Sequence, residues 1–198
     1  MIYWIAHGII AALSKIFFPI TVYGFQNIPR RTPIIFASNH RSNLDPVLIG
    51  LASSRRLSYI AKESLFKNPA FSFILYQVGA FPIRRDSGDA GAIKEAIKRL
   101  KKGGRVVIFP QGTRMVTLEE AKIQSGIGLL AVKSGAVIIP VYIDGSEKVM
   151  PPGAKFFKRS RINVSFGKPT NFSIEEPYEA IARRTMDGIK ALASRPPS

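Results

Sequence analysis

The sequence of 198 residues contains no cysteine and only two histidines. Without cysteine, the chain offers no thiol as a nucleophile and no thiolate as a metal ligand. The two histidines, His7 and His40, lie far apart, and neither has a set of metal-ligating residues near it in the sequence. We therefore expect no metal site. The absence of cysteine also fits a reducing compartment.

Acidic residues are scarce as well. The chain has 13 Asp and Glu residues against 29 Lys and Arg residues, a formal net charge of +16. This excess predicts an acidic partner, and nucleic acid is one candidate because cations bind its phosphates. The sequence shows no nucleic-acid-binding module, so we expect no nucleic acid partner. The basic clusters at residues 98–105 and 155–161 equally suit anionic lipid head groups, with a solvated helix face as the simpler alternative.

Internal repeats and low-complexity linkers are also missing, and the length fits one compact domain. Apolar runs predict strands at residues 21–23, 33–37, 57–61, 80–83, 105–109, 137–143 and 162–166. Apolar residues at three- and four-residue steps predict helices at residues 46–52, 64–78, 88–100, 118–133 and 174–193. This alternation indicates the α/β class, a single domain with a largely parallel twisted sheet flanked by helices. Ligands then bind at the carboxyl ends of the strands.

Residues 1–20 are almost all apolar or small, and their polar members fall on one side of a helix: His7, Ser14 and Lys15. The remaining wide apolar face consists of Tyr3, Trp4, Ile5, Ile9, Ile10, Leu13, Ile16 and Phe17. Lys15 interrupts the run before it reaches the roughly 20 residues of a membrane span. The pattern favours a helix, or a helical hairpin, that lies in one leaflet. A short transmembrane anchor and a core helix are the alternatives.

We therefore expect a membrane-associating segment at residues 1–20 and a folded domain at residues 21–198. A secretory signal peptide is disfavoured, because no charged region precedes the apolar stretch and no clear cleavage site follows it. A second apolar run at residues 71–82 and the segment 156–159 are further candidates for a membrane-facing surface. For residues 71–78 the helical spacing of the apolar side chains favours core packing instead.

His40 and Asp45 are separated by four residues. On a straight α-helix the two side chains would point about 140° apart, so a helix that carried both would keep them from meeting. The segment has to bend. The predicted strand at residues 33–37 precedes it, and Asp45-Pro46 is a favourable helix start, with Asp45 as the cap. His40 then lies in a strand-to-helix turn, with Asp45 free to reach back to its ring.

A histidine paired with a carboxylate can perform acyl transfer. A neutral imidazole takes a proton from a hydroxyl group, while the carboxylate fixes the tautomer and stabilises the imidazolium. A bound alcohol then becomes the nucleophile, and no serine or cysteine nucleophile is needed. The simpler alternative is that Asp45 is only a helix cap and His40 a hydrogen-bonded turn residue.

Two other segments suit phosphate binding. The predicted strand at residues 105–109 runs into Gln111, Gly112, Thr113 and Arg114, where glycine permits close approach and the last two residues offer a hydroxyl and a guanidinium. Arg84 and Arg85 follow the apolar run at residues 79–83 and suit a phosphorylated head group. A plain turn with solvated arginines is the alternative in both places.

Four segments together give a specific signal: NHRSNLDP at residues 39–46, GAFPIRR at 79–85, FPQGTR at 109–114 and VIIPVYI at 137–143. In order and spacing they resemble the four sequence blocks of the glycerolipid acyltransferases, of the lysophosphatidic acid acyltransferase type. The resemblance covers residues 22–143. The family pattern favours Arg85 over Arg84 as a substrate ligand.

The resemblance implies transfer of a fatty acyl group from acyl-CoA or acyl carrier protein to the free hydroxyl of lysophosphatidic acid, giving phosphatidic acid without a cofactor. His40 and Asp45 would be catalytic, and the phosphate would meet Arg114, Thr113, the backbone near Gly112, and Arg85. Membrane lipids would be a further partner. Because both donors are cytoplasmic, the resemblance places the protein on the cytoplasmic face of the inner membrane.

One departure from the family is Gln111, because the third block usually carries glutamate there. An amide can donate to a phosphate oxygen, whereas an unpaired carboxylate would repel it. The substitution is compatible with an anionic acceptor. It also keeps two alternatives open: an enzyme for another lysophospholipid or an amino-acid-containing lyso-lipid, and a catalytically silent lipid-binding protein.

Overall fold

The computed structural model describes residues 2–83, 90–112, 125–151, 154, 156 and 158–194. In this part of the chain a seven-stranded sheet has the order β1-β7-β6-β2-β5-β3-β4. The strands are β1 (Ile20–Tyr23), β2 (Ile34–Ser38), β3 (Ser58–Lys62), β4 (Ala80–Ile83), β5 (Arg105–Ile108), β6 (Val137–Asp144) and β7 (Ile162–Phe166). Neighbouring strands are parallel except for the antiparallel pair β6 and β7. The predicted α/β fold is confirmed, and each strand lies within one residue of its predicted position.

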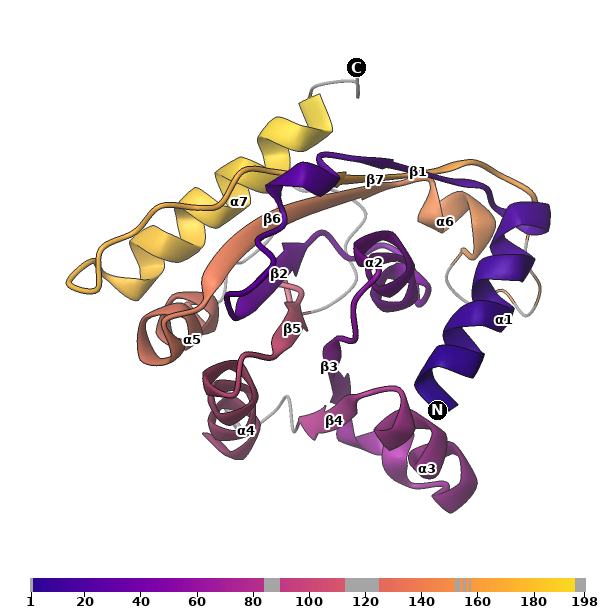
Figure 1. Cartoon of the computed structure of the whole chain (residues 1–198), viewed down its shortest axis with the longest axis horizontal. Coiled ribbons are helices and arrows are strands. Elements are labelled where there is room, and N and C mark those ends of the chain that lie inside the picture. The colour runs from indigo at the N-terminus through magenta and orange to yellow at the C-terminus, as the bar shows by residue number, and fades with distance from the viewer. Residues whose placement is uncertain are drawn as a thin grey trace.

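Helices cover both faces of this sheet (Figure 1). The described helices are α1 (Ile2–Phe17), α2 (Asp45–Ser53), α3 (Pro69–Gln77), α4 (Ala90–Lys101), α5 (Gly126–Ser134), α6 (Ser146–Val149) and α7 (Tyr178–Ser194), with 3₁₀ turns η1 (Phe25–Asn27) and η2 (Glu63–Phe66). One apolar core lies between the sheet and α2. A second lies between the sheet and α4, α5 and α7.

The helix boundaries differ from the prediction in three places. The helix predicted at residues 64–78 is divided into η2 and α3, because Pro69 disfavours helical backbone at Asn68, whose side chain instead accepts a hydrogen bond from Phe71 N. The helix predicted from residue 174 begins only at Tyr178, directly after Pro177. The short helix α6 was not predicted. Residues 88–89 and 118–124 of two other predicted helices lie outside the described part.

Helix α1 turns only part of its predicted polar side toward the domain, because Lys15 is exposed. Ser14 and Tyr3 are buried, whereas most of the predicted apolar face is exposed: Trp4, Ile5, Ile9, Leu13, Ile16 and Phe17. Tyr3 was predicted on that apolar face, and instead its hydroxyl donates to Arg55 O at 2.9 Å. Among the described residues, no helix has the length and apolar character needed to span a bilayer.

Gly128 lets α5 and α7 approach closely. A Cβ atom at Gly128 would lie 2.4 Å from the carbonyl oxygen of Tyr178, a backbone atom that has little room to move. We expect Gly128→Ala to lower the free energy of unfolding by about 1–3 kcal/mol, as overpacking does. In the same helix, Gly126 has no atom within 4 Å of such a Cβ, so Gly126→Ala is the matched control. Urea unfolding of both variants measures the difference, and equal stability of the two would contradict the close packing.

Strand β2 positions the candidate site. All five of its residues are buried, and they pair with β5 on one side and β6 on the other. Alternate side chains enter the two cores, as expected for a central strand. Because β2 is a central strand, its carboxyl end lies near the middle of the row of strand ends. From there the segment 39–44 leads into α2.

Candidate active site

The segment between β2 and α2 bends and brings His40 and Asp45 together. His40 Nδ1 lies 2.9 Å from Asp45 Oδ2. The same carboxylate oxygen accepts hydrogen bonds from the backbone N–H groups of Arg41 at 2.7 Å and Ser42 at 2.8 Å. The Asp45 side chain is fully buried. One oxygen atom thus fixes both the turn and the imidazole ring.

The predicted capping role of Asp45 is wrong. The residue before α2 is Leu44, and its side chain makes no cap hydrogen bond. The Asp45 carboxylate points backward to residues 40–42 rather than forward to the first amides of the helix. Because its donors lie on the preceding turn, the alternative in which Asp45 is only a helix cap is excluded.

Two contacts fasten this turn to the neighbouring strand β6 and to the residues that follow it. The Asn39 amide donates to Ile143 O and accepts from Ile143 N, both at 2.8 Å. Ser42 Oγ donates to Met150 O at 2.9 Å. Asn39 and Ser42 are both buried, so the turn that carries His40 is held inside the protein by residues that lie more than 100 positions later in the chain.

The His40 ring is held on its flat face as well. The ring of Phe109 stacks on it with a centroid distance of 4.0 Å and an interplanar angle of 20°. Since Asp45 takes Nδ1, the nitrogen available to a substrate is Nε2. Neither this stacking contact nor Phe109 was predicted from the sequence as part of the site. Phe109 is the first residue of the third sequence block, and its place in that block could have indicated that it lies near the site.

Gln111 lies beside His40. Its Oε1 atom accepts a hydrogen bond from the His40 backbone N–H at 3.3 Å. The residue is only 7 % exposed, and its Nε2 atom is buried without a hydrogen-bond partner among the described residues. The Gln111 side chain therefore accepts a hydrogen bond through Oε1, and its Nε2 group has no acceptor among the described residues.

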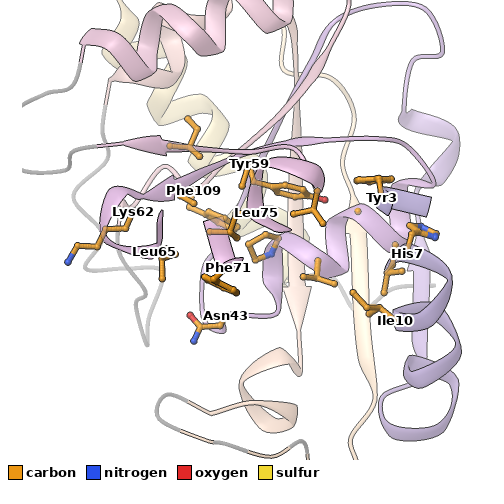
Figure 2. Close-up of a pocket in the computed structure, with 18 of the residues that line it drawn as sticks. Tyr3, His7, Ile10, Asn43, Tyr59, Lys62, Leu65, Phe71, Leu75 and Phe109 are labelled. Carbon is orange, nitrogen blue, oxygen red and sulfur yellow. The ribbon is translucent and has the colours of Figure 1, made fainter. Parts of the chain in front are cut away.

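A cavity of about 590 Å³ extends from His40 to the inner side of α1 (Figure 2). Its walls come from α1, α2, β3 and α3, and they are mostly apolar: Ile10, Pro46, Val47, Leu51, Ile60, Leu65, Phe71, Leu75, Val78 and Phe109. Tyr3, His7 and Tyr59 line the end near α1. Burial raises the pKa of Tyr59 well above its ordinary value, so its phenol stays protonated and neutral. The shape suits a long apolar chain with its reactive end at His40.

Lys62 lines the cavity and was not among the predicted site residues. Among the described residues it is the only lysine or arginine that lines the cavity. It ends β3 and pairs in register with Ile83 at the end of β4. The signal was available, because a cation directly after the predicted strand at residues 57–61 belongs at the ligand-binding edge of a parallel sheet.

Of the other predicted phosphate ligands, the structure describes Gly112 but not the arginines. Gly112 has a left-handed φ of 69°, and its N–H donates to Phe109 O in a tight turn after β5. Thr113 and Arg114 follow it, and Arg84 and Arg85 follow Ile83 of β4, but these four residues lie outside the described part of the chain. Their roles stay predictions.

The model of the acyltransferase family matches residues 19–144. A 1-acyl-sn-glycerol-3-phosphate acyltransferase of Bacillus subtilis is 30% identical over 76% of this chain and 73% of its own length. A chloroplastic enzyme of the same name from Arabidopsis thaliana is 29% identical over 79% of this chain. The match spans only 45% of the length of that plant enzyme.

Two further similarities bear on fold and acceptor. The crystal structure of a 1-acyl-sn-glycerophosphate acyltransferase from Thermotoga maritima superposes with a TM-score of 0.73, at 28% identity, over 95% of this chain and 78% of that one. An N-acylphosphatidylethanolamine synthase of Arabidopsis thaliana is 29% identical over 75% of this chain and 60% of its own length. Together with the matched blocks and the family model, these relatives show that the chain belongs to the acyltransferase family.

Proposed function

We propose that the protein transfers a fatty acyl group from a thioester donor to the free hydroxyl of lysophosphatidic acid and releases phosphatidic acid. The observation that carries this proposal is the His40–Asp45 pair, with a distance of 2.9 Å, at one end of an apolar cavity of about 590 Å³. The names of several relatives support the choice of acceptor.

In the proposed reaction, Asp45 holds the Nδ1–H of His40, so the lone pair on Nε2 faces the acceptor. Nε2 takes the proton of the hydroxyl as its oxygen attacks the thioester carbonyl carbon. The tetrahedral intermediate collapses, the carbon–sulfur bond breaks, and the imidazolium returns its proton to the leaving thiolate. The products are an oxygen ester and a free thiol of CoA or acyl carrier protein. The protein needs no cofactor for this step.

The acceptor phosphate would bind at the carboxyl ends of β3, β4 and β5. Lys62 supplies a cation on the cavity wall, and Arg85, Arg114 and Thr113 follow the same sheet edge in sequence. The Gly112 backbone and the unused Nε2 donor of Gln111 belong to the same proposal, as does Arg84 in a lesser role. A guanidinium fork matches phosphate geometry, and an ammonium adds a compact charge.

The free thiol gives a direct test. Purified protein would be mixed with acyl-CoA in micelles, with and without lysophosphatidic acid, and the thiol read with a thiol-reactive dye. Because the chain has no cysteine, the protein itself gives no background. Release that needs the acceptor is expected. No release with either CoA or acyl carrier protein donors would overturn the enzyme proposal and favour a silent lipid-binding protein.

The acceptor is tested in the same assay. Other lysophospholipids and an amino-acid-containing lyso-lipid replace lysophosphatidic acid. Phosphatidylethanolamine is also tested as an acceptor, because one relative is named an N-acylphosphatidylethanolamine synthase. We expect the phosphate monoester to be used best because its charge meets Lys62 and the arginines. A preference for an uncharged or amine acceptor would reassign the substrate but keep the acyl transfer.

The cavity should limit the length of the acyl chain. Leu75 projects from α3 toward the cavity (Figure 2), so Leu75→Trp would fill part of it. Since each methylene that loses its apolar surroundings costs about 0.8 kcal/mol, displacing two or three should lower the rate with a palmitoyl donor by about 10- to 100-fold. The rate with an octanoyl donor in the same variant is the internal control. An unchanged ratio of the two rates would place the acyl chain elsewhere.

We also propose that the protein works on the cytoplasmic face of the inner membrane, with residues 1–20 as its membrane-associating segment and residues 21–198 as the catalytic domain. The exposed apolar side chains of α1 support this proposal, as does the cytoplasmic origin of the donors. Fractionation of cells tests the location, with the natural chain compared with a variant in which the exposed α1 residues Ile5 and Ile9 are replaced by Gln. The segment itself is not removed, because Phe18 lies in the core and Ile20 belongs to β1.

A further inference from the structure

Helix α3 exposes large apolar side chains. Phe73, Ile74 and Tyr76 are 51–57% exposed, and no residue of α3 is buried. The predicted core packing of residues 71–78 is therefore wrong. Leu75 and Val78, on the inner side, line the cavity instead. A contiguous apolar surface of this kind indicates a binding partner.

The exposed sides of α3 and α1 belong to one surface. The inner sides of both helices line the same cavity, with Tyr3 and Ile10 from α1 and Phe71 and Leu75 from α3. In Figure 1 the amino-terminal end of α1 lies next to α3. The outward side chains of the two helices thus lie on the side of the cavity that faces away from the sheet. Trp4 is 54% exposed on α1, and Tyr76 is 51% exposed on α3.

A third element extends this surface. Phe156, in the segment between α6 and β7, is 84% exposed, and Lys158 and Arg159 beside it are exposed as well. The segment returns to the sheet beside the end of α1, because Ile162 N donates to Pro19 O at 3.1 Å. The two cations therefore precede by three or four residues the point where the chain reaches the start of β1, directly after α1.

The charges of these elements select the partner. Residues 1–44 and 148–174 contain no Asp or Glu, and residues 64–78 contain none either. Exposed cations accompany the apolar side chains: Lys15, Lys67, Lys158 and Arg159. A second copy of the chain would bring the same positive charge, and like charges repel. Tryptophan and tyrosine are enriched where proteins meet the bilayer interface, so an anionic lipid bilayer fits both the charge and the side chains.

We propose that α3 and the Phe156 segment dock on an anionic bilayer together with α1, as one three-part surface. The docked protein has its cavity directly behind the lipid-facing helices, so an acyl chain enters without crossing water. This proposal goes beyond the reaction, and its test does not need catalysis. The proposal on membrane docking can therefore be wrong while the proposal on acyl transfer is right, and the reverse.

The chain contains a single tryptophan, Trp4, so fluorescence reports on one helix at a time. Trp4 in the natural chain reports on α1. In a Trp4→Phe background, Tyr76→Trp reports on α3, and Ile174→Trp reports on an exposed position before α7 that is 75% exposed and belongs to none of the three parts. Vesicles would contain phosphatidylglycerol and brominated phosphatidylcholine. We expect quenching of the first two tryptophans but not of the third.

Sedimentation with vesicles measures how much each part contributes. The double variant Phe73→Gln, Ile74→Gln should bind at least about tenfold more weakly, because two large side chains no longer leave water. The matched control Ile174→Gln should bind as the natural chain does. The double variant Lys158→Gln, Arg159→Gln should lose about tenfold on phosphatidylglycerol vesicles and little on phosphatidylcholine.

The proposal is overturned if the tryptophan at position 76 stays unquenched while Trp4 is quenched, because α1 would then dock alone. It is also overturned if the α3 double variant binds vesicles as well as Ile174→Gln does. Equal binding to neutral and anionic vesicles by the natural chain would remove the role of the cations. Retention by acyl carrier protein but not by vesicles would assign the surface to an acidic protein.

Discussion

His40→Ala is expected to lower turnover by about 10²- to 10⁴-fold, the usual contribution of general-base catalysis. Asp45 occupies Nδ1, and Phe109 supports the face of the ring, so Nε2 is presented in one orientation. Alanine removes this base and leaves the hydroxyl of the acceptor with its proton. The drop should appear in kcat with little change in KM, because the ring makes its important interaction in the transition state.

Two measurements separate lost chemistry from lost structure. The thermal midpoint and the binding of lysophosphatidic acid should stay near those of the natural protein: the contacts to Asp45 and Phe109 are lost, but the Asp45 carboxylate keeps the Arg41 and Ser42 amides that hold the turn. Added imidazole should restore part of the activity by occupying the space left beside Phe109. Turnover within a few-fold of the natural protein would show that another group takes the proton, and the proposed mechanism would then fail.

Asp45→Asn is expected to lower turnover by roughly 10²- to 10⁴-fold through the tautomer of His40, as the corresponding change does in a catalytic triad. An amide oxygen can still accept from the N–H groups of Arg41 and Ser42, so the turn should survive. Asp45→Ala goes further and leaves the buried N–H of Ser42 without an acceptor. Each such orphan donor costs about 1–3 kcal/mol of stability.

The ring nitrogens report the difference directly. Because the chain has two histidines, a ¹⁵N spectrum contains signals from only two imidazoles, and His40→Ala assigns them. In Asp45→Asn the Nδ1-protonated form of His40 should lose population. Asp187→Asn, on an exposed position of α7, is the matched control and should leave the spectrum unchanged. A reduced turnover with an unaltered tautomer would mean that Asp45 acts only through the fold.

The strands were predictable because each is a short apolar run between turn residues, and the order of strands and helices fixed their parallel arrangement. The meeting of His40 and Asp45 was predictable too, since spacing excluded a common straight helix. The predicted ligands Arg84, Arg85, Thr113 and Arg114 lie outside the described part of the chain, so that part of the prediction is untested.

Other features could not be predicted from spacing. An aspartate before a proline suits both a helix cap and a carboxylate that reaches backward, and only the positions of the Arg41 and Ser42 amides decide between them. The outward side of α3 carries the same apolar pattern as a buried helix, so periodicity alone does not distinguish protein from lipid as its surroundings. The stacking of Phe109 on His40 depends on the pairing of β2 with β5, which lie far apart in the sequence.

The bonds that fasten the catalytic turn join residues that are distant along the chain. Asn39 bonds to Ile143, 104 residues later, and Ser42 bonds to Met150, 108 residues later. During synthesis, the turn therefore stays unfastened until the chain has been extended to Ile143 and Met150. Contacts of such high sequence separation form late because closing the intervening chain costs entropy. The turn that carries His40 and Asp45 is therefore among the later parts of the fold to become rigid, and a chain that stops before Ile143 lacks both of its fastening partners.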